Sequence, residues 1–247
     1  MPLPPELRRR LDRLATTALH RSWEWGRRKG LIGPDHPLAR RYGSFGQGSF
    51  VSFPTGDVVN GQAVHIGRDC MVGPDVTFSV GMPTEVYPTG GEPVISVGDR
   101  STVGKGCWLV ARRHIDIEAD VTFAPNVYVT DHNHTYADPW LPVGLQLLAE
   151  EPVRIGAGTW LGTNVVVLPG ADIGRNCTIA AGTVVRGKIP DHSVVAGVPG
   201  KVVRAWTADG GWDPPLRMEI PPIEGWPVGV PPDDAAGTTS PDEPRAE

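Results

Sequence analysis

The stretch that decides the fold runs from residue 155 to residue 184 and reads IGAGTWLGTNVVVLPGADIGRNCTIAAGTV. Large apolar residues recur in it every six positions, at Ile155, Leu161, Val167, Ile173 and Ile179. The same spacing occurs upstream in three pairs, which are Ile66 and Val72, Val97 and Val103, and Ile117 and Phe123. A fixed period of this kind is typical of a protein that stacks one repeated structural unit.

Two further positions of the repeat are restricted. The residue after the large apolar one is glycine in seven of the eleven repeats, although only 31 of the 247 residues are glycine. The residue four places after it is always small or β-branched. In an extended chain, offsets of zero, four and six positions point to one side, and a recurrent glycine marks a corner where a side chain would not fit. The pattern therefore predicts an all-β solenoid of short strands joined by corners.

The three cysteines follow from the same pattern. Cys70, Cys107 and Cys177 all occupy the small inward position, four residues after a large apolar one. We therefore expect them to be buried structural residues rather than reactive thiols, and no CxxC pair suggests a metal site or a disulfide framework.

The repeat, [LIV]-G followed by four residues, resembles that of the hexapeptide-repeat acyltransferases. The segment from Val153 to Arg204 resembles the C-terminal part of their sugar O-acetyltransferase branch, which includes maltose, galactoside and nodulation-factor acetyltransferases. The resemblance covers about Val58 to Arg204. It implies a left-handed parallel β-helix, acetyl-CoA as the acyl donor, a sugar or glycolipid acceptor, and a homotrimer whose active sites lie between subunits.

The rest of the chain predicts two appendages. We divide it into a helical or irregular cap at 1–57, the β-helix at 58–206 and a disordered tail at 207–247. Leu7, Leu11, Leu14 and Ala18 have three- and four-residue spacing, which predicts an N-terminal amphipathic helix. Nine prolines and nine acidic residues among the last 41 residues predict the tail.

Charge is divided between the two ends. Residues 207–247 carry nine acidic and two basic side chains, whereas residues 1–30 carry eight basic and three acidic ones. The basic end is either a solvated helix face or a region of peripheral contact with an anionic membrane surface. We expect a cytoplasmic protein, because the chain has no run of 18 apolar residues and no apolar signal-peptide core at its N-terminus. We expect no nucleic-acid partner.

The repeat is interrupted at 78–96 and at 130–154, and we expect both interruptions to form surface loops. A shorter slip at 111–116 shifts the register by two residues. The second interruption contains TDHNHTYADPW, residues 130–140. In the resembling family a loop histidine is the general base that deprotonates the acceptor hydroxyl.

The resemblance places this base five residues beyond Val129, which is His134, whereas His132 lies two residues short. We therefore take His134 as the first candidate and His132 as the second. Asp131 either orients an imidazole or caps a turn. Two other interpretations remain open: a pair of exposed loop histidines, and a zinc site formed with His114 in a non-catalytic or carbonic-anhydrase-like β-helix protein.

The resemblance also implies the coenzyme A contacts. Trp160 corresponds to the wall of the catalytic pocket, Thr163 and Ala181 to the pantetheine arm, and Lys201 and Arg204 to cations near the nucleotide phosphates. The chain departs from the family before Ile189 and Pro190, where it has Arg186, Gly187 and Lys188. Arg186 is therefore an additional candidate for coenzyme A binding, and no metal is expected.

Overall fold

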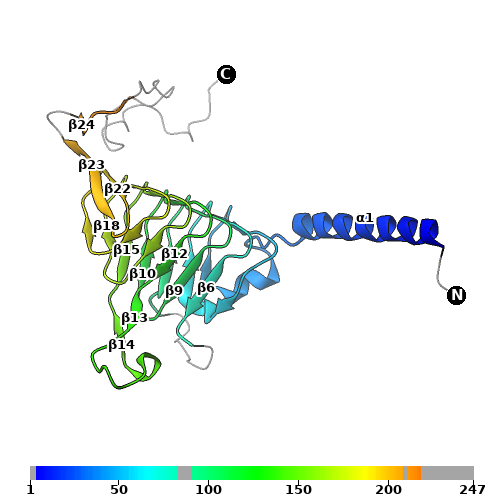
Figure 1. The fold of residues 1–247 in the computed structure, drawn as a ribbon, viewed down its shortest axis with the longest axis horizontal. Helices are drawn as coiled ribbons and strands as arrows, with labels where there is room; N and C mark the ends of the chain where they lie inside the picture. Colours follow the sequence, from blue (N-terminus) through cyan, green and yellow to red (C-terminus); the bar gives the residue numbers. More distant parts are fainter. Residues whose placement is uncertain (1–3, 83–90, 208–210, 218–247) are drawn as a thin grey trace.

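The computed structural model describes residues 4–82, 91–207 and 211–217. The strands of its coils form three parallel sheets, and consecutive coil strands lie in different sheets. Every third strand returns to the same sheet, one step further along the molecule (Figure 1). The chain is therefore a parallel β-helix with triangular coils, as the six-residue repeat predicts.

Each coil contributes one strand to each sheet. The first sheet contains β1 (Ser44–Phe45), β4 (Val64–Ile66), β7 (Ile95–Val97), β10 (Ile115–Ile117), β15 (Val153–Ile155), β18 (Asp172–Ile173) and β21 (Lys188–Ile189). The second contains β2 (Phe50–Val51), β5 (Met71–Val72), β8 (Thr102–Val103), β11 (Thr122–Phe123), β16 (Trp160–Leu161), β19 (Thr178–Ile179) and β22 (Ser193–Ala196), followed by the antiparallel strands β23 (Lys201–Thr207) and β24 (Gly211–Asp213). The third contains β3 (Val58–Val59), β6 (Thr77–Val80), β9 (Trp108–Ala111), β12 (Tyr128–Thr130), β17 (Val166–Val167) and β20 (Val184–Val185).

The core lies inside the coils, and the large apolar residues of the repeat form it. Strand pairing places equivalent residues above one another, so that Phe123 is in register with Val103 on one side and Leu161 on the other. All eleven of the large apolar repeat residues are exposed by 2% or less. Cys107 is also buried, and burial raises the pKa of its thiol to about 11, which keeps it protonated and unreactive as predicted.

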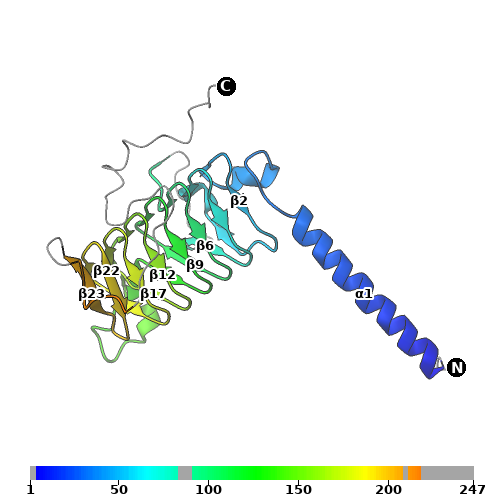
Figure 2. The same ribbon diagram turned by 90° about the horizontal axis from the view of Figure 1, so that it is seen from above.

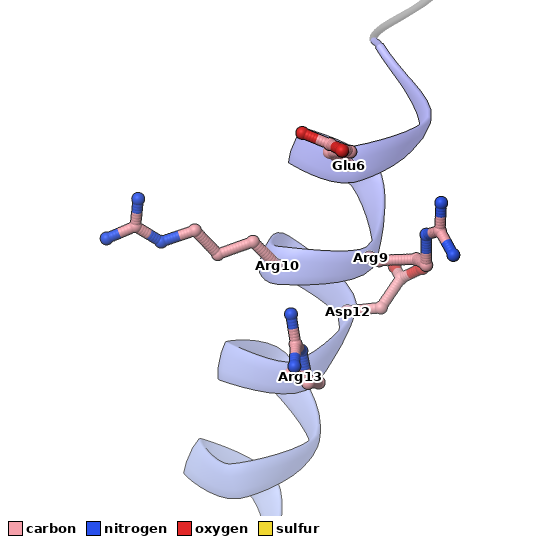
Figure 3. A pocket seen from close by; sticks show the side chains of 5 residues that line it. All are labelled: Glu6, Arg9, Arg10, Asp12 and Arg13. Carbon is pink, nitrogen blue, oxygen red and sulfur yellow. The ribbon is translucent and has the colours of Figure 1, made fainter.

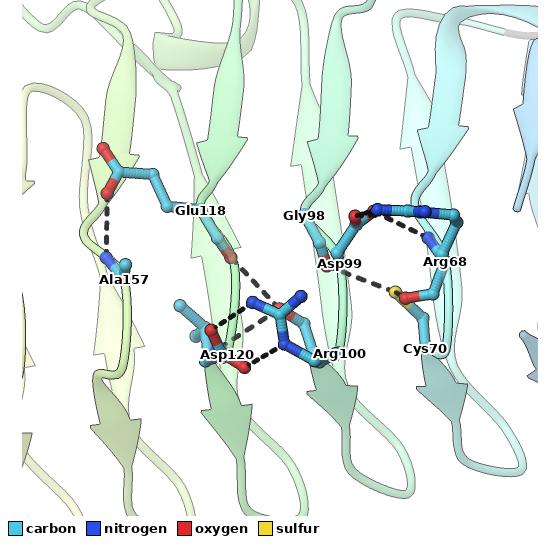
Figure 4. A network of polar contacts seen from close by, with 10 residues as sticks. Arg68, Cys70, Gly98, Asp99, Arg100, Glu118, Asp120 and Ala157 are labelled. Carbon is cyan, nitrogen blue, oxygen red and sulfur yellow. Dashed lines mark hydrogen bonds and ion pairs between the residues drawn. The ribbon is translucent and has the colours of Figure 1, made fainter. Parts of the chain in front are cut away.

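The corners show why glycine recurs. A Cβ on Gly98 would lie 2.5 Å from the backbone carbonyl carbon of Glu118 in the next coil, so a side chain there would force the coils apart. Charged residues at the same corners join neighbouring coils, as in the Arg68–Asp99 and Arg100–Asp120 ion pairs (Figure 4). These pairs are largely exposed, so most of the stability comes from the apolar interior.

Three predicted boundaries differ from the structure. The coils begin at Ser44 rather than at residue 58, because Phe45 and Val51 already follow the six-residue spacing and pair with the next coil. Phe78 belongs to strand β6, so the first interruption starts after Val80; residues 83–90 lie outside the described part. The predicted tail begins with ordered structure, since β24 pairs with β23, and residues 218–247 also lie outside the described part.

The predicted N-terminal helix is α1 (Pro5–Lys29), which projects away from the first coil (Figures 1 and 2). None of its residues is buried. Its C-terminal end meets the coils where the ring of Trp23 lies 5.6 Å from that of Phe53. No described helix is long and apolar enough to cross a membrane. Three short 3₁₀ helices occupy Pro37–Arg41, Gly61–Ala63 and Val143–Leu145.

Candidate active site

The predicted loop that carries the two histidines leaves the coils as a β-hairpin. It starts after β12, at the edge where the third sheet passes to the first. Strand β13 (His132–His134) pairs antiparallel with β14 (Leu148–Glu150), and the chain then re-enters the coils at β15. Figure 1 shows the hairpin projecting from the side of the β-helix. The loop is therefore fixed to one edge of the triangular coil.

Asp131 stands at the base of the hairpin and is fully buried. Its carboxylate accepts hydrogen bonds from three consecutive backbone N–H groups, those of Arg112 at 2.9 Å, Arg113 at 2.7 Å and His114 at 2.8 Å. These residues form the register slip of the neighbouring coil, where the backbone turns its N–H groups toward one point. Consecutive N–H groups of this kind form an anion-binding concavity.

The protonation state of Asp131 follows from these contacts. Burial by itself raises the pKa of the carboxyl group, but the hydrogen bonds from His132 and from the three backbone amides outweigh it and lower the pKa below the ordinary 3.8. Asp131 is consequently ionised at neutral pH. It can only accept hydrogen bonds in that form.

His132 is the imidazole that Asp131 holds. Its Nδ1 lies 2.9 Å from Asp131 Oδ1, and its side chain is 19% exposed. Because the carboxylate only accepts, Nδ1–H must donate, which leaves the lone pair of Nε2 free to accept a proton. An oriented neutral imidazole with a free Nε2 is the arrangement that a general base requires.

His134 has no comparable partner. Its backbone pairs with Leu148 across the hairpin, its side chain is exposed, and no hydrogen bond to its ring occurs within the described part of the chain. Asp131 therefore contacts the second candidate of the sequence analysis, and not the first. Of the two roles considered for Asp131, its contact with His132 fits the orientation of an imidazole, while its other bonds go to the backbone of the neighbouring coil and not to a turn of its own.

Further contacts hold the hairpin in place. The Nε–H of Arg112 donates to Glu150 at 3.0 Å, and the N–H of Glu151 donates to the carbonyl of Asp131 at 2.8 Å. Thr130 donates from its hydroxyl to the carbonyl of His132 at 3.1 Å. The sequence analysis did not identify Arg112 or Glu150 as site residues. The register slip was the available signal, since a break in a regular repeat frees backbone groups to bind something else.

A cavity of about 390 Å³ lies between the hairpin and the adjacent coil edge. Asn133, Tyr136 and Glu151 line it from the side of the hairpin, and Gly170 and Arg186 line it from the coils. Arg186 therefore shares an edge of the molecule with the histidine hairpin.

The other predicted coenzyme A residues gather elsewhere. Trp160 begins β16 and points outward from the second sheet, with 45% of its surface exposed. Thr163 and Ala181 lie at the following corner, where the N–H of Gly182 donates to the carbonyl of Thr163 at 2.9 Å. Lys201 and Arg204 lie on β23, which extends the same sheet.

The two groups of residues are separated within one chain. In a triangular coil, the edge between the third and first sheets lies opposite the second sheet, so the Asp131–His132 pair and Trp160 are on opposite sides of the β-helix. One chain places Asp131, His132 and Arg186 along one edge of the coils. The other predicted coenzyme A residues lie away from that edge, and they are Trp160, Thr163, Ala181, Lys201 and Arg204.

The metal interpretation gains no support from the geometry. In the described ranges, no group of three His, Cys, Asp or Glu side chains is arranged to hold a metal ion. The Nδ1 of His114 lies 2.9 Å from the carbonyl of Pro93, and that of His132 contacts Asp131. These two rings therefore have other partners.

Asp131 also predicts a pH dependence of stability. A carboxylate whose pKa is lowered by folding stabilises the folded state fully above its unfolded-state pKa, and this contribution is lost as pH falls through the folded-state pKa. We expect Asp131→Asn to lower the free energy of unfolding by about 2–3 kcal/mol at pH 7, with a deficit that shrinks below about pH 4. Denaturant titrations of the wild type and of Asp131→Asn, from about pH 3 to pH 7, measure this difference in the free energy of unfolding. Asp12→Asn, on exposed α1, is the control, and an equal deficit at acidic and neutral pH would contradict the expectation.

Comparisons with known proteins identify the class. Residues 152–187 match the family profile described as bacterial transferase hexapeptide (six repeats). The fold is similar to that of AntD, an N-acyltransferase from Bacillus cereus, with a TM-score of 0.60 at 14% identity, covering 72% of this chain and 92% of that one. The repeat and the fold are thus those of hexapeptide-repeat proteins.

Two curated relatives narrow the class to a family. The chain is 35% identical over 141 residues to the Escherichia coli K12 protein named "Putative lipopolysaccharide biosynthesis O-acetyl transferase WbbJ", covering 54% of this chain and 70% of WbbJ. It is 31% identical over 144 residues to the galactoside O-acetyltransferase of the same organism, covering 56% of this chain and 62% of that enzyme, which is less than two thirds of its length. The chain belongs to the hexapeptide-repeat acyltransferases, in their sugar O-acetyltransferase branch.

Proposed function

We propose that the chain transfers an acetyl group from acetyl-CoA to a hydroxyl group of a sugar or polysaccharide precursor, with His132 as general base and Asp131 as its positioning residue. The observation that carries the proposal is the 2.9 Å contact between Asp131 Oδ1 and His132 Nδ1 at the base of the hairpin. The names of WbbJ and of the galactoside O-acetyltransferase support a carbohydrate hydroxyl as acceptor. A left-handed coil, as in that family, is part of the proposal.

The chemistry follows from the free Nε2 of His132. It takes the proton of the acceptor hydroxyl while the oxygen attacks the thioester carbonyl of acetyl-CoA. The tetrahedral intermediate then collapses to the acetyl ester, and the departing thiolate of coenzyme A takes the proton from the imidazolium. Asp131 remains ionised and stabilises the imidazolium between the two proton transfers. A hydroxyl is a poor nucleophile at neutral pH, so this base contributes about 10²- to 10⁴-fold to the rate.

The residues on the second sheet are assigned to coenzyme A. Trp160 and the corner of Thr163 and Ala181 provide an apolar wall and backbone groups for the pantetheine arm. Arg204 offers a specific reason to expect a phosphate. Its Nε is buried, and no described residue accepts a hydrogen bond from it. An unpaired buried guanidinium N–H is costly, so we expect the Arg204 side chain to turn outward and pair with the phosphates of coenzyme A beside Lys201.

The separation of the two groups leads to the proposed assembly. One chain presents the base at an edge of the coil and the coenzyme A residues on the opposite face. A closed ring of copies can place the hairpin of one subunit against the second sheet of the next, because a head-to-tail interface closes under rotational symmetry. We therefore propose a homotrimer with each active site shared by two subunits.

The test is an acceptor screen with the purified full-length chain. We expect coenzyme A thiol release from acetyl-CoA to depend on an added sugar, and the product to lose its acetyl group in mild alkali, as an ester does. A product that resists alkali would indicate an amine acceptor and contradict this part of the proposal. Binding of coenzyme A without turnover of any sugar in the panel would argue against the proposed acceptor class.

A further inference from the structure

Helix α1 is the largest element that the proposed function does not use. It has 25 residues, none of them buried, and it projects beyond the first coil (Figure 2). Helices in proteins are stabilised mainly by packing one face against something, since isolated helices in water are marginal. A helix whose faces are all exposed therefore implies a surface that is absent from the single chain.

One side of α1 is apolar. Leu7, Leu11, Leu14, Ala18 and Trp25 lie within an arc of about 60° at the 3.6-residue period of an α-helix. We call these five residues the apolar stripe. Its four large side chains, all except Ala18, are between 42% and 61% exposed. The stripe is separate from Trp23, which contacts Phe53.

The rest of α1 is strongly basic. Its eight basic residues, against three acidic ones, are Arg8, Arg9, Arg10, Arg13, Arg21, Arg27, Arg28 and Lys29. In Figure 3, the side chains of Arg9, Arg10 and Arg13 extend from the first turns in different directions. The side chains that line the pocket there, Glu6 and Asp12 included, all belong to this one helix, so it is an open surface rather than an enclosed site. Within the described part of the chain, no charge of α1 takes part in a salt bridge.

We propose that α1 lies flat on an anionic lipid surface. The apolar stripe would enter the boundary between headgroups and acyl chains, with Trp25 at the interface, while the arginines that flank the stripe contact the lipid phosphates. The charge of the helix complements a membrane rich in acidic lipids. Since no described helix qualifies as a membrane span, the contact is peripheral. This inference rests on α1 alone and does not depend on the proposed catalytic function.

Charge also argues against a second copy of α1 as the partner. The stripe has the spacing of a coiled-coil seam, but the same register places Arg21 and Arg28 in the seam itself. Arg8 and Arg10 flank the seam on both sides. Parallel packing of copies would thus bring like charges together, whereas an anionic surface attracts the basic residues that flank the stripe.

The experiment is co-sedimentation of the full-length chain with vesicles of phosphatidylcholine, with or without phosphatidylglycerol. We expect binding to the vesicles that contain phosphatidylglycerol, and weaker binding as salt screens the arginines. The double variant Leu11→Gln/Leu14→Gln should bind these vesicles at least about tenfold more weakly, because it removes two side chains that would be buried in lipid. The matched control Thr16→Gln/Thr17→Gln, outside the stripe, should bind like the wild type.

A second variant tests the charge. Arg8→Gln/Arg10→Gln, which removes the two arginines that flank the stripe, should lose most of the preference for phosphatidylglycerol. Equal binding to both kinds of vesicle, no binding to either, or unchanged binding of the Leu11→Gln/Leu14→Gln variant would overturn the proposal. If that variant instead lowered the mass measured by light scattering while vesicle binding stayed the same, α1 would be an interface between copies of the chain.

Discussion

Replacing His132 by alanine is expected to lower kcat by about 10²- to 10⁴-fold, because the acceptor hydroxyl then loses its proton acceptor. His134→Ala is expected to leave kcat close to that of the wild type, since its ring is exposed and has no orienting partner among the described residues. The two residues lie on the same short strand, so the pair serves as its own matched control. Steady-state kinetics with saturating acetyl-CoA and the best acceptor of the screen measure both variants.

A chemical rescue separates a base from a structural residue. If His132 accepts the proton, imidazole added in solution should restore part of the activity of His132→Ala and should leave that of the wild type unchanged. Unaltered thermal unfolding of His132→Ala would exclude loss of the fold. If His134→Ala lost activity and His132→Ala kept it, the base would be His134, and Asp131 would be a structural anchor of the hairpin.

Mixed assemblies test whether the site is shared between subunits. His132→Ala and Trp160→Ala chains are each expected to have little activity alone. Trp160→Ala should lower the rate of acetyl transfer by about 10- to 10²-fold, because the thioester loses a wall that positions it. When the two chains are co-expressed, random assembly into trimers should give about a quarter of the sites an intact hairpin from one subunit and an intact Trp160 from its neighbour. Activity should therefore reappear at about a quarter of the wild-type level.

The control for this experiment combines two variants that both lack the proposed base. Co-expression of His132→Ala with Asp131→Asn/His132→Ala should restore nothing, because no subunit then supplies the base. Light scattering must first show that the mixed assemblies are trimers. If His132→Ala and Trp160→Ala then fail to complement one another, the two residues act in one site of the same subunit, which contradicts an active site shared between subunits.

Much of this molecule could be predicted from its sequence. The six-residue spacing from Ile155 to Ile179 predicts the coils, the inward side chains and the burial of the three cysteines, and the structure confirms all three. The reason is that each of these features depends on a repeated local geometry, in which a strand of fixed length alternates with a corner that has room only for a small residue. The departure of the chain from the coils near residue 131, as a surface loop, was predicted for the same reason, since the spacing stops there.

The choice between His132 and His134 could not be predicted in this way. Counting five residues beyond Val129 assumes that the chain continues as in its relatives, but the orientation of an imidazole depends on its hydrogen-bond partner. That partner, Asp131, is held by backbone N–H groups 17 to 19 residues earlier in the chain, which the coils bring alongside it. The sequence by itself determined the β-helix and the segment that carries the proposed base, because both follow from local spacing. Only the tertiary structure decided which histidine is oriented and which faces carry the two groups of candidate residues, because those depend on contacts between coils.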